Sequence, residues 1–322
     1  MTYTRIVGTG RYLPERILTN ADLEKMVETS DEWIRTRTGV ERRHIAAPDQ
    51  STSDLCVEAA KAAMDAADVG PEDIDFIAIG TTSPDQVFPN IATIVQDRLG
   101  IPACPALSLE AACTGFIYAL STVDKYIRLG EARCALVIGA EIISQLVDWS
   151  DRTTCVLFGD GAGAVIVKPS EEAGIISSKL GADGQYRDLL YYPYGPTKQL
   201  AKAGVDDVGI QMIGNEVFKV AVRTLGNVAE QTLVDNGIEQ SQLDWLIPHQ
   251  ANLRIIQATA KRLGVPMEKV ILTVQDHGNT SAASVPMALD VAVRDGRVQR
   301  GQLILMEAFG GGFTWGSVLM RY

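Results

Sequence analysis

The amino-acid sequence has no uninterrupted apolar stretch near the roughly 20 residues that a membrane-spanning helix needs. We also expect no signal peptide, because residues 1–5 lead directly into a strand-like segment. Positive charge is in deficit, and the formal net charge of −11 argues against general binding to nucleic acid or to an anionic membrane. We therefore expect a protein that acts away from both.

Paired cysteines are also missing. The five cysteines form no CxxC pair and their number is odd, which excludes a disulfide framework and a cysteine zinc site. This usage is typical of the reducing cytoplasm, so we expect a cytoplasmic protein with no metal site. No low-complexity tract or linker divides the 322 residues, which are enough for two domains or for one unit built twice.

Three blocks of sequence recur in the same order, which predicts a duplicated α/β unit with a pseudo-twofold axis. Residues 74–79 match 243–248 at an offset of 169, and residues 163–167 match 316–320 at an offset of 153. Between them, an offset of 166 matches Cys113, Gly130 and Glu141 with Asn279, Gly296 and Glu307. We place the two halves at residues 1–172 and 173–322, and expect residues 181–209 to form a surface excursion.

Cys113 is the candidate nucleophile. It follows a short apolar strand (104–109) and precedes a helix that runs from Phe116 to a glycine cap at Gly130. A cysteine at such a turn lies near free backbone N–H groups and the positive end of the helix dipole, so we expect its pKa to fall below about 8.5. The alternative is that Cys113 is a small core residue, as free cysteines usually are.

His249 and Asn279 are the candidate partners of Cys113. His249 directly follows a buried strand, where open α/β sheets place their active sites. Asn279 lies in the turn that the repeat makes equivalent to the Cys113 turn, so all three residues are expected to meet near the axis. Of the other two histidines, His277 is expected to hold the Asn279 turn and His44 to be a surface residue.

Three glycines, Gly310–Gly312, follow the last buried strand but one. Their backbone N–H groups can approach a substrate closely and form an oxyanion hole with the N–H of Cys113. The alternative is a tight structural turn. A phosphate loop is disfavoured because no lysine follows the glycines. The glycine-rich segment 159–163 precedes a strand rather than following one, so it is not a dinucleotide fingerprint.

With these residues assembled, the sequence closely resembles the β-ketoacyl-acyl carrier protein synthase III family over essentially its whole length. The similar segments are GTG (8–10), DEWIRTRTG (31–39), GDGAGA (159–164), GNEVFKVAV (214–222), PHQANLRI (248–255), HGNTSAAS (277–284) and EAFGGGFTWGS (307–317). The resemblance implies a thiolase-like α/β fold with five layers, α-β-α-β-α. Two departures are Thr114, where alanine is commoner, and a 190–207 loop that looks longer than in the family.

The resemblance also implies an activity. Cys113 would take an acyl group from a short acyl-coenzyme A, and malonyl-acyl carrier protein would then replace the coenzyme. His249 and Asn279 would hydrogen-bond the malonyl thioester as carbon dioxide leaves, while Phe309 walls the pocket. The N–H groups of Cys113 and Gly311 would bind the second oxyanion. No cofactor is implied, because coenzyme A enters as a substrate thioester.

The same resemblance assigns further binding residues. Trp33 and Arg152 would sandwich the adenine of coenzyme A, with Arg37 near its phosphates and Asn215 on its pantetheine arm. Phe88 would reach across a homodimer interface to close the partner's acyl pocket. The alternative for Trp33 and Arg152 is a core residue and a solvated side chain.

A basic patch is the candidate docking site for the acidic carrier protein. Arg254 and Lys261 are seven residues apart and share a helix face, with Arg262 adjacent and Lys219 nearby. The family segment that leads into this helix adds Gln250, Ala251, Asn252 and Leu253. The alternative is an ordinary solvated helix face.

Three other functions fit part of this pattern. Papain-like proteases also have a Cys…His…Asn order, but the duplicated pattern and Gly310–Gly312 argue against a hydrolase. A scaffold without activity is disfavoured because none of the three polar groups is replaced. Related condensing enzymes of specialised metabolism, which use another acyl donor, stay open, and the sequence does not identify the acyl primer.

Overall fold

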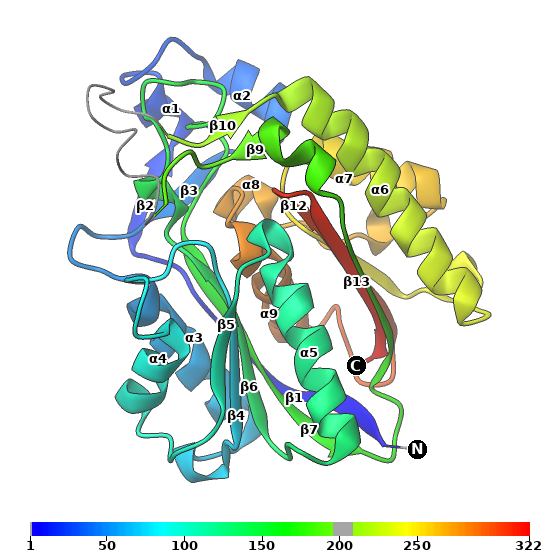
Figure 1. The fold of residues 1–322 in the computed structure, drawn as a ribbon. Helices are drawn as coiled ribbons and strands as arrows, with labels where there is room; N and C mark the ends of the chain where they lie inside the picture. The colour runs from blue at the N-terminus through cyan, green and yellow to red at the C-terminus, as the bar shows by residue number, and fades with distance from the viewer. Residues whose placement is uncertain (1, 196–208) are drawn as a thin grey trace.

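The structure is a computed structural model that describes residues 2–195 and 209–322 (Figure 1). Among these residues the strands form two large sheets. The first has the order β1-β7-β6-β4-β5, and its strands are β1 (Tyr3–Tyr12), β4 (Phe76–Gly80), β5 (Ala106–Leu109), β6 (Ala135–Glu141) and β7 (Gly161–Ser170). The second has the order β11-β12-β13-β8, with β8 (Ile175–Ala182), β11 (Trp245–Pro248), β12 (Leu303–Gly310) and β13 (Thr314–Arg321).

Helices separate and cover the two sheets. They are α1 (Asn20–Leu23), α2 (Asp31–Thr38), α3 (Thr52–Ala67), α4 (Ile91–Leu99), α5 (Gly115–Leu129), α6 (Gly214–Asp235), α7 (Leu253–Leu263), α8 (Val274–His277) and α9 (Ser284–Arg294). Helices α3 and α4 pack on the outer face of the first sheet, α5 and α9 lie between the sheets, and α6 packs with α7 outside the second. This α-β-α-β-α arrangement confirms the predicted fold class.

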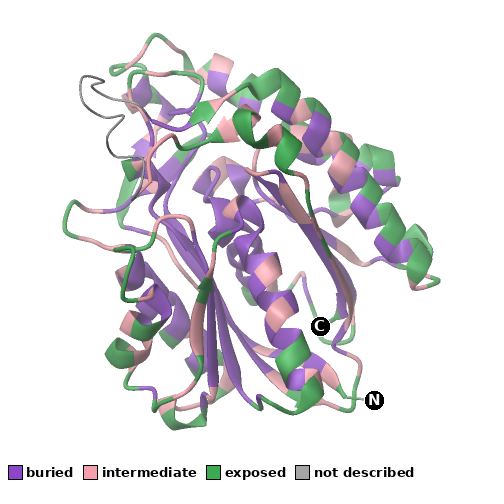
Figure 2. Cartoon of the chain, viewed as in Figure 1, coloured by how far each residue is buried: buried purple, intermediate pink, exposed green. Residues whose placement is uncertain are grey.

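Burial follows the layers, as Figure 2 shows. Strands β4 and β6 are buried at every position, as is typical of interior strands with continuous apolar sequences. The central helix α5 buries one apolar side and ends at Gly130, whose φ of 78° confirms the predicted glycine cap. Within the described residues, no helix is both long and apolar enough to cross a bilayer.

Two smaller ribbons complete the described chain. Strands β2 (Arg16–Thr19) and β3 (Arg42–Ile45) form one, and β9 (Leu190–Tyr191) and β10 (Gln211–Met212) form the other. Residues 196–208, which make up much of the predicted surface excursion and of the predicted long loop, lie outside the described residues. The first large sheet uses residues 3–170 and the second uses 175–321, while the division into halves at residues 172 and 173 stays a prediction.

The strand pairing corrects one part of the predicted repeat. Phe76 pairs with Ala135 in the first sheet and Trp245 pairs with Ile304 in the second, so both strand pairs are related by 169 residues. The same shift relates the short 3₁₀ turns η2 (Ala112–Thr114) and η8 (Ser281–Ala283), which both begin with a positive φ. The offset of 153 for the last strands is confirmed, because Val167 pairs with Ala135 and Met320 with Ile304.

The predicted offset of 166 for the middle block is therefore wrong. By position in the fold, the counterpart of Cys113 is Ala282, and the counterpart of Glu141 is Gly310. Glu141 ends its strand, whereas Glu307 lies inside β12 opposite Pro248, so the recurrence of glutamate at that spacing is a coincidence. Asn279 lies just ahead of the η8 turn rather than at the place equivalent to Cys113.

Paired glycines at the end of the first sheet allow the two turns to approach each other. Gly80 and Gly139 are neighbours in the sheet. A methyl group added at Gly80 would lie 2.2 Å from the carbonyl carbon of Gly115, and one at Gly139 would lie 2.2 Å from the carbonyl oxygen of Ala282. Because real contacts of this kind are not that short, only glycine permits both turns to pack on these strands.

We predict that Gly139→Ala destabilises the protein by about 1–3 kcal/mol, the usual cost of overpacking a core, and lowers activity by displacing the η8 turn. Gly184→Ala is the matched control, since a methyl group there meets nothing within 4 Å. Chemical denaturation of the two variants measures the difference. Equal free energies of unfolding would contradict the packing argument.

Candidate active site

Cys113, His249 and Asn279 line one cavity of about 290 Å³. They come from different elements: the η2 turn before α5, the residue after β11, and the segment before η8. Each is buried, with 9%, 4% and 6% of its surface exposed. The structure therefore brings the Cys113 sulfur, from the unit of the first sheet, together with the His249 and Asn279 side chains from the unit of the second sheet.

Cys113 also borders a second cavity, of about 470 Å³, on which His249 and Asn279 do not border. Gly311, Ser281 and Tyr191 are among its lining residues. Cys113 thus borders both cavities. The first is lined by the His249 imidazole and the Asn279 carboxamide, and the second by tyrosines, by Ile143 and Leu146, and by the glycine turn.

The ionisation of Cys113 differs from the prediction. Burial raises the pKa of its thiol to about 12, and the charges on Glu141 and Glu110 act in the same direction. A hydrogen bond with the Ser281 side chain lowers the pKa by less than burial raises it. The expectation of a thiolate in the resting protein is therefore wrong, because the walls of the site remove the water that would stabilise the charge.

The backbone around Cys113 is tightly fixed. Ala112 has a φ of 46°, in the left-handed region that non-glycine residues rarely adopt. A methyl group at Gly310 would lie 2.6 Å from the backbone nitrogen of Cys113, so the glycine turn packs directly on the nucleophile's peptide. Thr314 donates its hydroxyl to Ala111 O at 2.8 Å, and Thr114, the departure from the family pattern, donates to Thr314 O at 3.2 Å.

His249 is neutral and oriented. Burial lowers the pKa of its imidazole to about 3. Its Nδ1 lies 2.6 Å from Ser284 Oγ, which also accepts the backbone N–H of Gln250 at 3.3 Å. We assign the Ser284 proton to this contact, which places the imidazole proton on Nε2. The ring therefore presents an N–H donor.

Asn279 is clamped by backbone from the other unit. Its N–H donates to Leu157 O at 2.8 Å, and its carbonyl accepts the N–H of Gly159 at 3.0 Å. Its side-chain Oδ1 accepts the N–H of Ser281 at 2.9 Å, which leaves the Nδ2 amide as the available donor. His277 was expected to hold this turn, but its Nδ1 is buried without a hydrogen-bond partner.

Arg43 is a residue that sequence reasoning missed. It is fully buried in β3 and donates to Leu18 O, Asn20 Oδ1 and Val156 O. Burial lowers its pKa to about 10. By fixing Val156, it supports the segment that clamps Asn279. The available signal was its position two residues before Ile45, which places both side chains on the same face of the strand.

Several residues that were expected to contact the substrates also line the first cavity. Trp33, Arg37, Asn215 and Phe309 all line it. Trp33 is half-buried, and the guanidinium carbons of Arg37 and Arg152 lie 5.6 and 5.5 Å from its ring centroid. Arg152 is not among the lining residues and donates to Glu28 O at 2.8 Å.

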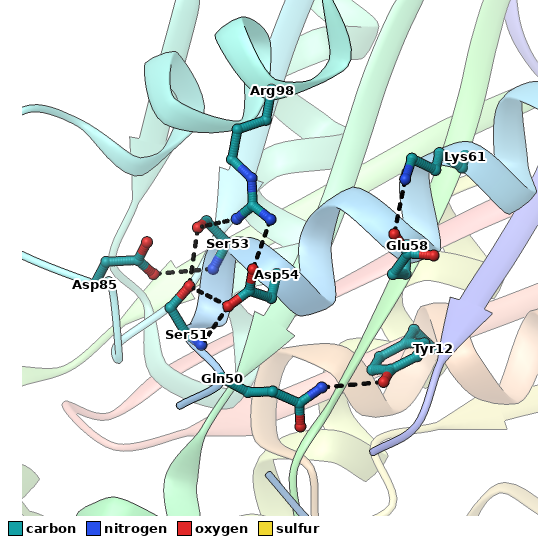
Figure 3. A network of polar contacts seen from close by, with 9 residues as sticks. All are labelled: Tyr12, Gln50, Ser51, Ser53, Asp54, Glu58, Lys61, Asp85 and Arg98. Atoms are coloured by element: carbon teal, nitrogen blue, oxygen red, sulfur yellow. Dashed lines mark hydrogen bonds and ion pairs between the residues drawn. The ribbon is translucent and has the colours of Figure 1, made fainter. Parts of the chain in front are cut away.

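Phe88, like Arg152, is a predicted substrate-binding residue that lines neither cavity in the described chain. Its side chain is 83% exposed, beside the exposed Val87. The loop that carries it is anchored nonetheless, because Asp85 accepts the N–H of Ser53 at the start of α3 (Figure 3). In the same network Arg98 of α4 donates to Ser53 and Asp54.

The basic residues of the predicted docking patch are exposed, and their contact with a carrier protein stays a prediction. Arg254, Lys261, Arg262 and Lys219 are exposed, although Lys219 pairs with Glu216 at 2.7 Å. Arg254 lies beside the first cavity, over the ring of Phe218.

The residues before α7 have structural tasks. Gln250 is fully buried, and its amide bonds Pro248 O, Ile271 O and the N–H groups of Thr273 and Val274. The prediction that Gln250 contacts a carrier protein is therefore wrong. Asn252 caps α7 and donates to Arg37 O, while Leu253 packs on Gly39. Ala251 is half-buried and lines the cavity.

Two buried carboxyl groups near the site were also missed as functional candidates. Glu141 is fully buried at the end of β6, and its oxygens accept hydrogen bonds from Thr82, Ser83 and Ser281. Glu307 is fully buried in β12, beside Phe309, and neither carboxyl oxygen has a hydrogen-bond partner. Burial raises the pKa of Glu307 to about 8, so it is protonated at neutral pH. Within residues 2–195 and 209–322, no group of His, Cys, Asp and Glu side chains is arranged to hold a metal ion.

Two parts of the chain match models of a known protein family. Residues 107–184 match the family described as 3-oxoacyl-[acyl-carrier-protein (ACP)] synthase III, and residues 233–322 match its C-terminal counterpart. The beta-ketoacyl-[acyl-carrier-protein] synthase III of Thioalkalivibrio sulfidiphilus is 59% identical over 322 residues, covering 100% of both chains.

Solved structures of related proteins have the same fold. The 3-oxoacyl-[acyl-carrier-protein] synthase III from Aquifex aeolicus superposes with a TM-score of 0.93 and 48% identity, covering 99% of this chain and 100% of that one. The priming beta-ketosynthase of the R1128 polyketide biosynthetic pathway gives a TM-score of 0.95 at 35% identity, covering 99% and 96%.

We predict that Glu307→Gln changes how stability depends on pH. Between pH 4.5 and about 8 the unfolded chain releases the Glu307 proton while the folded protein keeps it, so the free energy of unfolding falls as pH rises. Gln removes this contribution, and the slope becomes less negative by up to about 1.4 kcal/mol per pH unit. Urea denaturation from pH 5 to 8 measures the slopes, with the exposed Glu131→Gln as control. Parallel curves for Glu307→Gln and the parent protein would refute the assignment.

Proposed function

The chain belongs to the 3-oxoacyl-[acyl-carrier-protein] synthase III family, and from this membership we infer how its residues divide the reaction. The protein is an acyltransferase that initiates fatty-acid synthesis by a decarboxylating condensation of an acyl-coenzyme A with malonyl-acyl carrier protein. The product is a 3-oxoacyl-acyl carrier protein. The observation that supports our assignment of residues is the single cavity lined by Cys113, His249 and Asn279.

The first half-reaction is acyl transfer to Cys113. The sulfur attacks the thioester carbon of the acyl-coenzyme A, and the bond to the coenzyme's sulfur breaks. Backbone N–H groups of Cys113 and Gly311 stabilise the oxyanion, a role supported by the packing of the glycine turn on the nucleophile's peptide. Covalent capture divides one difficult step into two easier ones. The acyl chain then occupies the second cavity.

The second half-reaction is decarboxylation and condensation. His249 Nε2–H and Asn279 Nδ2–H donate to the thioester oxygen of the malonyl group, on which negative charge grows as carbon dioxide leaves. Neutral donors that are already oriented in a buried site stabilise that charge, because no solvent has to reorganise around it. Phe309, which is 5% exposed, forms an apolar wall that disfavours the carboxylate. The enolate carbon attacks the acyl-Cys113 carbonyl, and the Cys113 sulfur leaves.

Coenzyme A binds at the mouth of the first cavity. Trp33 and Arg152 offer flat surfaces for adenine, Arg37 a charge for its phosphates, and Asn215 an amide for pantetheine. A planar ring stacked between Trp33 and Arg152 needs about 3.5 Å on each side, or about 7 Å in total. The guanidinium carbon of Arg152 now lies only 5.5 Å from the Trp33 ring centroid. Binding therefore moves Arg152 away from Trp33. No cofactor is required, because the coenzyme is a substrate.

The carrier protein docks on the exposed face around Arg254, Lys261, Arg262 and Lys219. Cations there suit an acidic partner, even though the enzyme as a whole is acidic. The enzyme works as a homodimer in the cytoplasm, in which the exposed Phe88 closes the partner's acyl cavity. The exposed apolar pair Val87 and Phe88 on an anchored loop supports this arrangement.

A condensing enzyme of specialised metabolism is the alternative function. The priming ketosynthase of the polyketide pathway shares 35% identity, against 59% for the relative named for acyl carrier protein synthase III. Identity therefore favours the initiation of fatty-acid synthesis.

We predict that incubation with a panel of acyl-coenzyme A thioesters adds one acyl group to Cys113, detected by intact-mass spectrometry. Cys113→Ser should take up no group as a thioester, and the preferred chain length identifies the primer. His249→Ala and Asn279→Ala should still be acylated but should lose about 10²-fold or more in decarboxylation of malonyl-acyl carrier protein. Acylation at another residue would contradict the proposed nucleophile.

We predict that Arg254→Glu raises the KM for malonyl-acyl carrier protein about tenfold, because an attraction becomes a repulsion and each is worth up to about 1 kcal/mol. The KM for acyl-coenzyme A should change far less. Arg133→Glu is the control, since Arg133 is highly exposed next to the opposite end of β6. Equal effects on both substrates would remove the patch from the docking site.

A further inference from the structure

Glu141 is a buried carboxyl group with hydrogen-bond donors on both of its oxygens. It is fully buried at the end of β6, and among the described residues no cation pairs with it. Its Oε1 accepts the hydroxyls of Thr82 and Ser281 at 3.0 and 3.2 Å. Its Oε2 accepts the backbone N–H and the hydroxyl of Ser83 at 3.1 and 2.5 Å. The N–H of Thr82 reaches both oxygens, and the hydroxyl of Thr81 lies 3.3 Å from Oε2.

These donors come from two segments that are far apart in the sequence. Residues 81–83 follow β4 in the unit of the first sheet, whereas Ser281 is the first residue of the η8 turn in the unit of the second sheet. Ser83 Oγ also accepts the backbone N–H of Ile142 at 2.9 Å, which ties residues 81–83 to the end of β6 a second time. Glu141 therefore joins a loop of one unit to a turn of the other.

The backbone of Ser281 has a conformation that its surroundings must hold in place. Its φ of 49° lies in the left-handed region, which is uncommon for a residue with a side chain. Such a conformation persists only where the neighbouring structure determines it. The Ser281 hydroxyl is fixed by Glu141, so this hydrogen bond is one of the contacts that keep the η8 turn in position.

The same residue orients the Asn279 carboxamide. The backbone N–H of Ser281 donates to Asn279 Oδ1 at 2.9 Å, which leaves Nδ2 as the donor for a substrate. If Ser281 moves, this contact is lost and the carboxamide is free to rotate. A rotated carboxamide presents its oxygen instead of its N–H, and that oxygen repels the negative charge of an enolate. The direction of the Asn279 donor therefore depends on where Ser281 is held.

Both protonation states of Glu141 are able to make these contacts. Burial raises its pKa to about 7, so the carboxylate and the carboxylic acid are both present at neutral pH. The N–H groups of Thr82 and Ser83 can only donate, and Oε2 accepts from both. A serine hydroxyl can also accept, so a proton on Oε1 can be donated to Ser281 Oγ. The contact with Ser281 then persists with its direction reversed.

We propose that Glu141 is a positioning residue for decarboxylation, because it holds Ser281 and Ser281 in turn directs the Asn279 amide toward the malonyl thioester. The inference rests on the proposed function. Without the hydrogen bond between Glu141 and Ser281, malonyl-acyl carrier protein still binds, but the donor is no longer oriented when charge grows on the thioester oxygen. The loss therefore falls on kcat rather than on KM.

The test is the release of carbon dioxide from malonyl-acyl carrier protein by Ser281→Ala, measured in a Cys113→Ala background. That background excludes any effect of Ser281 on the thiol. We expect kcat to fall about tenfold and KM to change by less than about twofold. Ser121→Ala, which removes a buried hydroxyl bonded to Ser178, is the matched control and should change neither. An unchanged kcat, or a loss confined to KM, would overturn the proposal.

A double-mutant cycle tests whether Ser281 acts through Asn279. Asn279→Ala removes the carboxamide that Ser281 orients. In that variant the further substitution Ser281→Ala should not lower kcat again, because no donor is left to misdirect. If the two losses add instead, Ser281 acts on another group and the proposal is wrong.

Two substitutions of Glu141 separate hydrogen bonding from charge. Glu141→Gln should keep kcat within about threefold, because its carbonyl oxygen accepts the N–H groups and its amide donates to the hydroxyls. Glu141→Leu has a similar size but no acceptor, so it should lose about tenfold or more, as Ser281→Ala does. Equal effects of the two substitutions would contradict a positioning role. If Glu141→Leu does not fold, as judged by circular dichroism, the cycle of Ser281 and Asn279 still decides.

Amide hydrogen exchange, followed by mass spectrometry, separates this proposal from the function on which it rests. If the Cys113→Ala background releases no carbon dioxide, the proposed function fails, but exchange still reports on the contact between Glu141 and Ser281. The peptide that covers residues 279–283 should exchange about tenfold faster in Ser281→Ala and Glu141→Leu than in the parent or in Ser121→Ala. Unchanged exchange in both variants would refute the positioning role even in an active enzyme.

Discussion

The structure depends on backbone packed against backbone at the ends of the central strands. Gly139 lies against the carbonyl of Ala282, Gly80 against the peptide of Gly115, and Gly310 against the nitrogen of Cys113. No side chain fits at these points, so the turns from the two sheets come within reach of one another. Asn279 is then fixed by hydrogen bonds to Leu157 and Gly159. The distances needed for chemistry follow from close packing rather than from flexible side chains.

Burial determines the protonation states of the groups in the site. It keeps His249 neutral and Cys113 protonated, and it leaves Glu141 close to its midpoint at neutral pH. A site that contained ready-made ions would be costly to bury. The cavity lined by Cys113, His249 and Asn279 instead contains an uncharged thiol, an uncharged imidazole and a carboxamide.

The sequence was sufficient where a signal was local or periodic. Buried strands, the glycine cap at Gly130 and the strand ends that carry His249 could be predicted because their patterns depend on neighbouring residues. Other features depend on contacts between distant segments. The pKa of Cys113 was predicted in the wrong direction because the walls that bury it come from the other unit. Arg43, Ser281 and Ser284 were missed because polar residues in unexceptional segments gain their partners only after folding, and Gln250 was misassigned because a motif does not reveal which way a side chain points.

The 169-residue relation between the two turns has an evolutionary consequence. Ala282 occupies the place that corresponds to Cys113, and its methyl group already lies 3.3 Å from where a side chain on Gly115 would begin. A thiol is therefore present in only one of the two related turns. The first unit contributes that thiol and the second contributes His249 and Asn279, so the two related units have diverged into different contributors to a single cavity.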